Sequence, residues 1–72
     1  MSNYLPLRAE DISIEPWGRG DVLMDGSVRS QRGVRITHKA TGVSGESDYY
    51  TSQLRNKEEA LAILVHRLER LP

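Results

Sequence analysis

Two stretches of the chain alternate polar and apolar side chains, and each predicts a β-strand. The stretches are residues 11–15 and residues 34–39. A period of two puts the apolar side chains of a strand on one face, where they can be buried. Pro16 has no backbone N–H, so it either ends the first strand or places that strand at a sheet edge. The apolar positions are Ile12 and Ile14 in the first stretch, and Val34, Ile36 and His38 in the second.

A stripe of apolar residues near the C-terminus predicts an amphipathic helix. Between Leu54 and Leu71, leucines and other apolar residues recur at spacings of three and four, which is the period of a helix with one buried face. Ser52 or Thr51 can cap the start of this helix, and Asn56 offers an alternative start.

The segments around these elements have weaker patterns. Residues 1–10 are expected to form an extended lead-in that packs apolar side chains on the body. Residues 18–33 show no dominant period and indicate a long loop, in which Asp25-Gly26 suits a two-residue turn. Residues 43–50 follow a Thr-Gly turn and predict a weak third strand at an edge. The whole chain is therefore expected to be one α+β domain, in which a small, mostly antiparallel sheet of three or four strands packs on one long C-terminal helix as a two-layer sandwich.

The composition is typical of one small globular domain. The chain has 72 residues, of which 38% are hydrophobic and 28% charged. Because it has no cysteine and two histidines, disulfide bonds and thiolate metal sites are excluded, and we expect neither a metal nor another cofactor. No apolar run approaches the roughly 20 residues of a membrane span, and the N-terminus does not resemble a secretory signal. We therefore expect a cytoplasmic protein.

The charges cancel overall but are unevenly distributed. Ten basic and ten acidic side chains give a net charge of zero, whereas a strongly basic domain would indicate a nucleic-acid partner. Residues 10–25 contain five acids and one base, and residues 26–45 contain four bases and no acid. These bases could form a strip that binds phosphates. Alternatively, opposite charges face each other across the sheet and neutralise locally.

The residues alone show no catalytic constellation. His38 has the apolar parity of its strand and is expected to be packed or at the surface, without a nucleophile to serve. Arg19-Gly20-Asp21 spells the integrin-binding tripeptide, but three residues match easily by chance and nothing indicates secretion. Gly18-Arg19-Gly20 lacks the third glycine of a dinucleotide-binding loop.

Several short motifs keep a joint spacing over most of the chain. They are Val34-Arg35-Ile36-Thr37-His38, Thr41-Gly42-Val43, Ser52-Gln53, Asn56 and the apolar run Ala60 to Leu64. Asp11, Ile12, Ile14 and Trp17 extend the set upstream. Together they resemble the peptidyl-tRNA hydrolase domain of bacterial class I peptide chain release factors, without a gap and over about residues 11–70. The resemblance implies the same two-layer fold.

The chain departs from that family at the catalytic loop. The resemblance implies a Gly-Gly-Gln motif that positions the hydrolytic water, yet this motif falls on Leu23-Met24-Asp25. A carboxylate there would repel RNA phosphates and a developing oxyanion. Gln31 has no glycine pair before it, Thr51 replaces the arginine of the Arg-Ser-Gln motif, and only Pro72 follows the helix where rescue hydrolases have a basic tail. We expect no hydrolase activity and no catalytic residue.

Two functions follow from these observations. The first is a non-catalytic, release-factor-like module that binds the ribosome or ribosomal RNA, modulating termination or rescue. Its expected RNA contacts are Arg29, Arg32, Arg35, Lys39, Ser52, Gln53, Arg55 and Lys57. The alternative is a protein–protein interaction module that uses an apolar loop tip at Val22, Leu23 and Met24, flanked by Asp21 and Asp25. If that tip folds back onto the sheet, it belongs to the core instead. Neither function involves a membrane or a small-molecule substrate.

Overall fold

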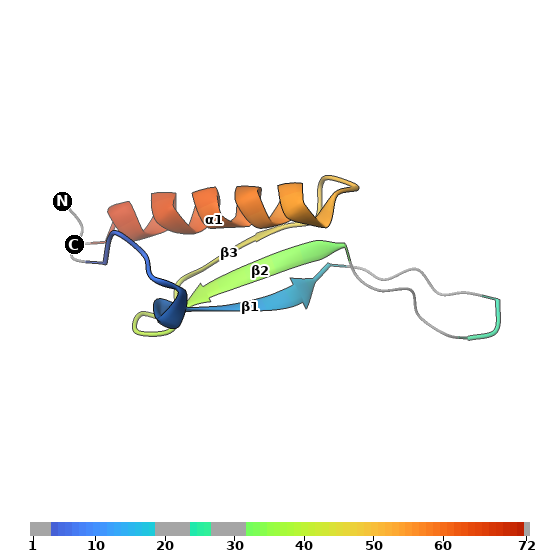
Figure 1. Cartoon of the computed structure of the whole chain (residues 1–72), viewed down its shortest axis with the longest axis horizontal. Coiled ribbons are helices and arrows are strands. Elements are labelled where there is room, and N and C mark those ends of the chain that lie inside the picture. The colour runs from blue at the N-terminus through green and yellow to red at the C-terminus, as the bar shows by residue number, and fades with distance from the viewer. Residues whose placement is uncertain (1–3, 19–23, 27–31, 72) are drawn as a thin grey trace.

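The computed structural model describes residues 4–18, 24–26 and 32–71. The elements are the 3-10 helix η1 (Ala9–Asp11), the strands β1 (Ile12–Trp17), β2 (Gly33–His38) and β3 (Ser44–Ser47), and the helix α1 (Gln53–Glu69). The three strands form one antiparallel sheet in the order β1-β2-β3, and α1 lies along one face of it (Figure 1). The predicted two-layer α+β fold is confirmed, with three strands in the sheet.

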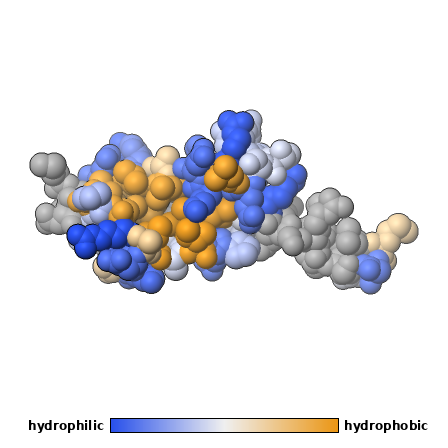
Figure 2. Space-filling model, in the orientation of Figure 1, coloured by the Kyte–Doolittle hydropathy of each residue, from blue (hydrophilic) through white to orange (hydrophobic). Residues whose placement is uncertain are grey.

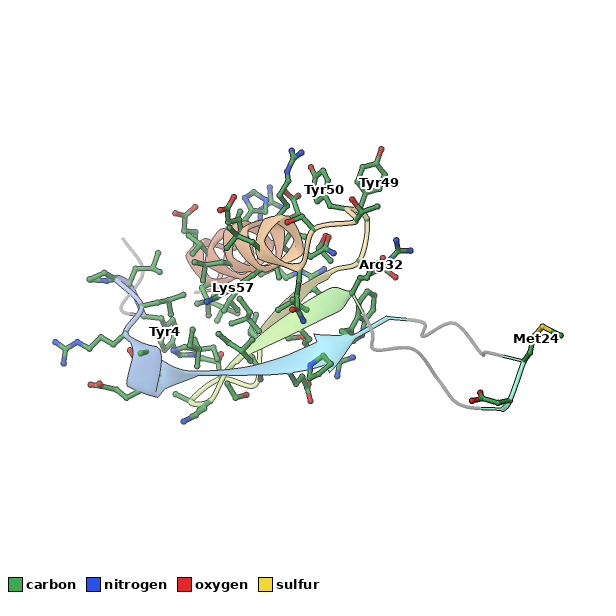
Figure 3. The ribbon with its side chains drawn as sticks, turned by 45° about the vertical axis from the view of Figure 1, so that its right-hand side comes forward. Tyr4, Met24, Arg32, Tyr49, Tyr50 and Lys57 are labelled. Atoms are coloured by element: carbon green, nitrogen blue, oxygen red, sulfur yellow. The ribbon has the colours of Figure 1, made fainter. Side chains whose placement is uncertain are left out.

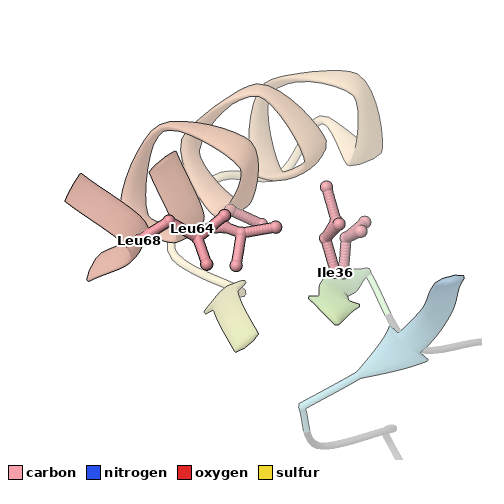
Figure 4. Packing of buried hydrophobic residues seen from close by; sticks show 5 residues of the cluster. Ile36, Leu64 and Leu68 are labelled. Carbon is pink, nitrogen blue, oxygen red and sulfur yellow. The ribbon is translucent and has the colours of Figure 1, made fainter. Parts of the chain in front are cut away.

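The core lies between α1 and the middle strand. Every fourth residue of α1 from Asn56 to Leu68 is buried, and these residues face the apolar positions of β2. The buried apolar residues are Val34, Ile36, Ala60, Leu64 and Leu68. Figure 4 shows Leu64 and Leu68 of the helix on the side of Ile36. Each such aliphatic side chain larger than alanine contributes about 1.5–3 kcal/mol by its burial. The predicted apolar stripe of the helix is buried only in part, because Leu54 is 64% exposed and Leu61 is 37% exposed.

The N-terminal lead-in contributes to this core, as predicted. Tyr4, Leu5 and Leu7 are partly buried against the core residues. The lead-in is not extended over its whole predicted length, because η1 begins at Ala9. The amide of Asp11 donates to the carbonyl of Arg8 over 2.9 Å, which closes this short turn before β1.

Pro16 lies inside β1, at the free edge of the sheet. The amide of Lys39 donates to the carbonyl of Asp11 over 2.9 Å, and hydrogen-bonded pairs alternate along an antiparallel ladder. Pro16, which faces Val34, therefore occupies a non-hydrogen-bonded pair, and its nitrogen points away from β2. The missing N–H costs no ladder bond, and the strand continues to Trp17, two residues beyond the predicted end.

The helix covers β2 and β3 more fully than β1. Ile14 faces the helix side of the sheet, yet half of its surface is exposed, and Leu61 on α1 is 37% exposed. Figure 2 shows apolar side chains gathered on the face that contains this opening. The edge strand thus contributes less to the core than its alternating pattern suggests.

The weak strand β3 forms because α1 comes unusually close to it at Gly45. A β-carbon on Gly45 would collide with the carbonyl oxygen of Ala60 and would lie 2.6 Å from the backbone nitrogen of Leu64. A real side chain here would force helix and strand apart. The glycine that weakens the strand pattern in the sequence is therefore the residue that permits the packing.

We expect Gly45→Ala to lower the free energy of unfolding by about 1–3 kcal/mol, because the added methyl group overpacks the contact between β3 and α1. Ser44→Ala on the same strand is the matched control and should change stability by less than about 0.5 kcal/mol. Urea denaturation followed by circular dichroism measures both. Equal stabilities of the two variants would show that the close approach is not required.

Candidate nucleic-acid interface

The buried side chain of Asn56 joins the first turn of α1 to three other segments. Its Nδ2 donates to the carbonyl oxygens of Arg32 (3.0 Å) and Tyr50 (2.8 Å). Its Oδ1 accepts from the amide of Tyr50 (2.9 Å) and from the hydroxyl of Ser47 (3.2 Å). Both donors and both acceptor positions of the amide are therefore used, and the starts of β2 and α1 are held at the end of β3.

The helix begins at Gln53, and Ser52 is its N-cap. The Ser52 hydroxyl accepts from the amide of Arg55 over 3.3 Å. The alternative start at Asn56 is wrong, because Asn56 already lies in the first helical turn and its side chain serves the four bonds above. Of the predicted RNA contacts, Ser52 thus has a structural role in capping, and Gln53 is exposed beside it.

Cations gather around this end of the domain. Arg32, Arg55 and Lys57 are all exposed. The Arg32 backbone is bonded to Asn56, so Arg32 lies beside the helix start although the two are far apart in sequence. The Arg55 guanidinium lies 4.2 Å from the centroid of the Tyr50 ring, an attractive cation–π geometry. Figure 3 shows Arg32 and Tyr50 at the end of the molecule where α1 begins.

Two further members of the predicted basic strip, Arg35 and Lys39, do not join this group. Arg35 lies on the open face of the sheet, where its guanidinium pairs with Glu15 of β1 over 3.4 Å and where its register partner in β3 is Glu46. These neighbouring carboxylates balance the charge of Arg35. This agrees with the alternative in which opposite charges neutralise each other across the sheet. Lys39 follows β2 at the opposite end of the sheet, and Arg29 lies outside the described residues.

His38 is a packed residue. It is 4% exposed, its Nδ1 lies 2.9 Å from the Thr41 hydroxyl, and its ring meets Tyr4 edge-on at a centroid distance of 5.4 Å. These contacts join the lead-in to the end of β2. They match the expectation of a packed histidine.

The described part of the long loop is a turn at residues 24–26, remote from the core. Met24 is fully exposed, and Gly26 has the positive φ of 87° that a tight turn requires. The turn lies beyond the ends of β1 and β2 (Figure 1). Met24 therefore does not fold back onto the sheet. The other predicted tip residues, Val22 and Leu23, and the flanking Asp21 lie outside the described residues.

Sequence reasoning missed the two adjacent tyrosines before the helix. Tyr49 is 86% exposed, and its ring meets that of Tyr50 edge-on at 5.1 Å. The available signal was a pair of bulky aromatic residues in a segment otherwise composed of small and polar residues. That pattern does not show on which side of the chain the rings lie.

Within the described residues, no group of three or more histidine, aspartate or glutamate side chains is placed to hold a metal ion. In the same part of the chain, no helix has both the length and the apolar character needed to cross a membrane. Comparisons with protein-family models, curated proteins and solved structures give no match for this chain.

Replacing Asn56 should destabilise the whole domain. In Asn56→Ala, the buried groups of Arg32, Ser47 and Tyr50 lose their partners, so we expect the free energy of unfolding to fall by about 3 kcal/mol or more. Gln53→Ala, on the exposed side of the same turn, should change it by less than about 0.5 kcal/mol. Thermal and urea unfolding measure both variants, and a loss below about 1 kcal/mol for Asn56→Ala would contradict the central role of this amide.

Proposed function

We propose that the chain is a non-catalytic module of the release-factor hydrolase type, and that it binds ribosomal RNA through the end of the domain where α1 begins. The observation that carries the proposal is an electrostatic conflict in the helix. The first turn of α1, all of it described, contains no acidic residue, but it carries Arg55 and is followed by Lys57.

The amino end of a helix has a partial positive charge, so acidic side chains stabilise it and cations oppose it by about 0.3–1 kcal/mol each. Arg55 is thus placed where the helix end alone disfavours it, the Tyr50 ring offsetting part of this cost, and Arg32 adds a second cation near the same end. A phosphate would resolve this conflict, since it interacts favourably with the helix end and with the guanidinium groups. Local conflicts of this kind are typical of functional sites.

The fold and the loop support the remaining parts of the proposal. The order of strands and helix agrees with the architecture implied by the motif resemblance, and Ser52, Gln53 and Asn56 stand at the helix start, as those motifs require. The exposed turn carries Met24 and Asp25 at positions where the hydrolase family has glycine and glutamine. These side chains supply neither the flexibility nor the amide of the catalytic motif, so the module binds without hydrolysing peptidyl-tRNA.

Cosedimentation with 70S ribosomes and separated subunits tests this function. We expect the wild-type chain to pellet at low salt and to be released as the salt concentration rises, because phosphate contacts displace counterions. The double variant Arg32→Glu with Arg55→Glu should lose this binding. Arg8→Glu with Arg70→Glu changes the charge equally at exposed positions elsewhere and should keep it. The proposal fails if the wild type stays in the supernatant at every salt concentration, or if both variants weaken binding equally.

A second candidate function rests on Met24. A fully exposed apolar side chain on a turn remote from the core suits a protein partner. In this case the chain contacts a protein partner through Met24. Any binding to the ribosome then goes through a ribosomal protein and not through ribosomal RNA.

Met24→Asp distinguishes the two candidates. The substitution should leave the melting temperature unchanged, because Met24 contributes nothing to the core. Under the RNA proposal, cosedimentation with ribosomes is also unchanged, because the cations lie at the helix start. Loss of cosedimentation in a folded Met24→Asp protein would instead assign the contact to the turn.

A further inference from the structure

A pocket of about 350 Å³ lies among the end of β1, the end of β3 and the side of α1. Its walls combine aromatic rings with carboxylates, and none of the predicted RNA contacts lines it, although Arg55 lies over the Tyr50 ring at its border. The rings belong to Trp17, Tyr49 and Tyr50, and the carboxylates to Glu46, Asp48 and Glu59.

The lining of the pocket is strongly acidic. None of the lining residues is basic. Glu46 is partly neutralised by Arg67, whose guanidinium reaches it from outside the pocket at 3.5 Å. Among the described residues, the carboxylates of Asp48 and Glu59 have no ion-pair partner, so their charge favours a cation in the pocket over a phosphate.

The chemistry of the walls favours an organic cation over a metal ion. No group of three or more metal-ligating side chains is placed to hold a metal among the described residues, so the three carboxylates of the pocket do not converge on one point. The faces of tryptophan and tyrosine rings, in contrast, attract guanidinium and ammonium groups. The protein itself provides an example, because the Arg55 guanidinium already lies over the Tyr50 ring.

The pocket is open to solvent on one side. Asp48, Tyr49 and Glu59 are all exposed, so the site is a surface recess and not an enclosed cavity. We propose that this pocket binds the guanidinium or ammonium group of an arginine or lysine side chain that belongs to a basic peptide segment of a partner protein. The proposal does not depend on RNA binding, because the carboxylates and the rings of Trp17 and Tyr49 take the cation, although Arg55 borders the pocket through its contact with Tyr50.

The single tryptophan of the chain provides a direct readout. Trp17 is the only tryptophan, and it lines the pocket, so its fluorescence reports on occupancy. We would titrate the full chain, without RNA, with a glycine–serine peptide that contains three arginines. A peptide in which citrulline replaces each arginine is the matched probe, since citrulline has nearly the same shape but is uncharged, with a carbonyl oxygen in place of one NH2 group.

We expect the arginine peptide to change the Trp17 signal saturably, and the citrulline peptide to leave it unchanged. Asp48→Asn with Glu59→Gln should weaken the binding of the arginine peptide about fivefold, because two exposed charge interactions are removed. Glu58→Gln with Glu69→Gln removes the same charge from exposed positions of α1 that do not line the pocket, and it should bind like the wild type.

Three outcomes would overturn the proposal. One is a Trp17 signal that does not respond to the arginine peptide, and another is equal binding of the citrulline peptide. The third is equal weakening by the two double variants, which would show a general effect of net charge. Circular dichroism confirms that each variant is folded. Because no RNA is present, these results are independent of the ribosome experiment.

Discussion

The arrangement of this domain depends on the four hydrogen bonds of Asn56. A buried amide with every partner in place contributes modestly to stability, whereas the same amide with missing partners is costly, so it strongly favours one arrangement. Here that arrangement brings Arg32, Ser47 and Tyr50 to the first turn of α1. Apolar burial is non-directional, whereas the hydrogen bonds of this amide require one position of the helix on the sheet.

That selection gives a protein of zero net charge two surfaces of opposite character. Arg32 and Arg55 are attached to segments that the amide holds, and they lie near the start of α1, whereas Lys57 lies apart from Arg32 and Tyr50 (Figure 3). Asp48 and Glu59, beside the same turn, form a negative pocket with the aromatic rings. Net charge is a sum over the whole chain and does not show this segregation. The proposed contact with RNA and the proposed contact with a peptide both depend on the position in which Asn56 holds the turn before α1.

The sequence predicted the elements whose pattern is local. Period-two and helical spacing located β1, β2 and α1. The position of Asn56 was recognised, but its role depends on contacts with β2 and β3 that no local pattern contains. Gly45 made β3 look weak because the benefit of a missing side chain arises only when α1 lies against it. The six predicted cations were treated as one strip, but cross-strand register pairs Arg35 with Glu15 and places Lys39 at the far end.

Mapping the RNA contact residue by residue would test this account most directly. A chain of this size is suited to NMR, and the ¹⁵N-labelled protein can be titrated with a short RNA hairpin at low salt. The account predicts that amide shifts concentrate at Arg32 and residues 53–57, and that Lys39 and the strand residues around Arg35 stay unchanged. Shifts confined to the open face of the sheet, or to the turn at residues 24–26, would contradict it.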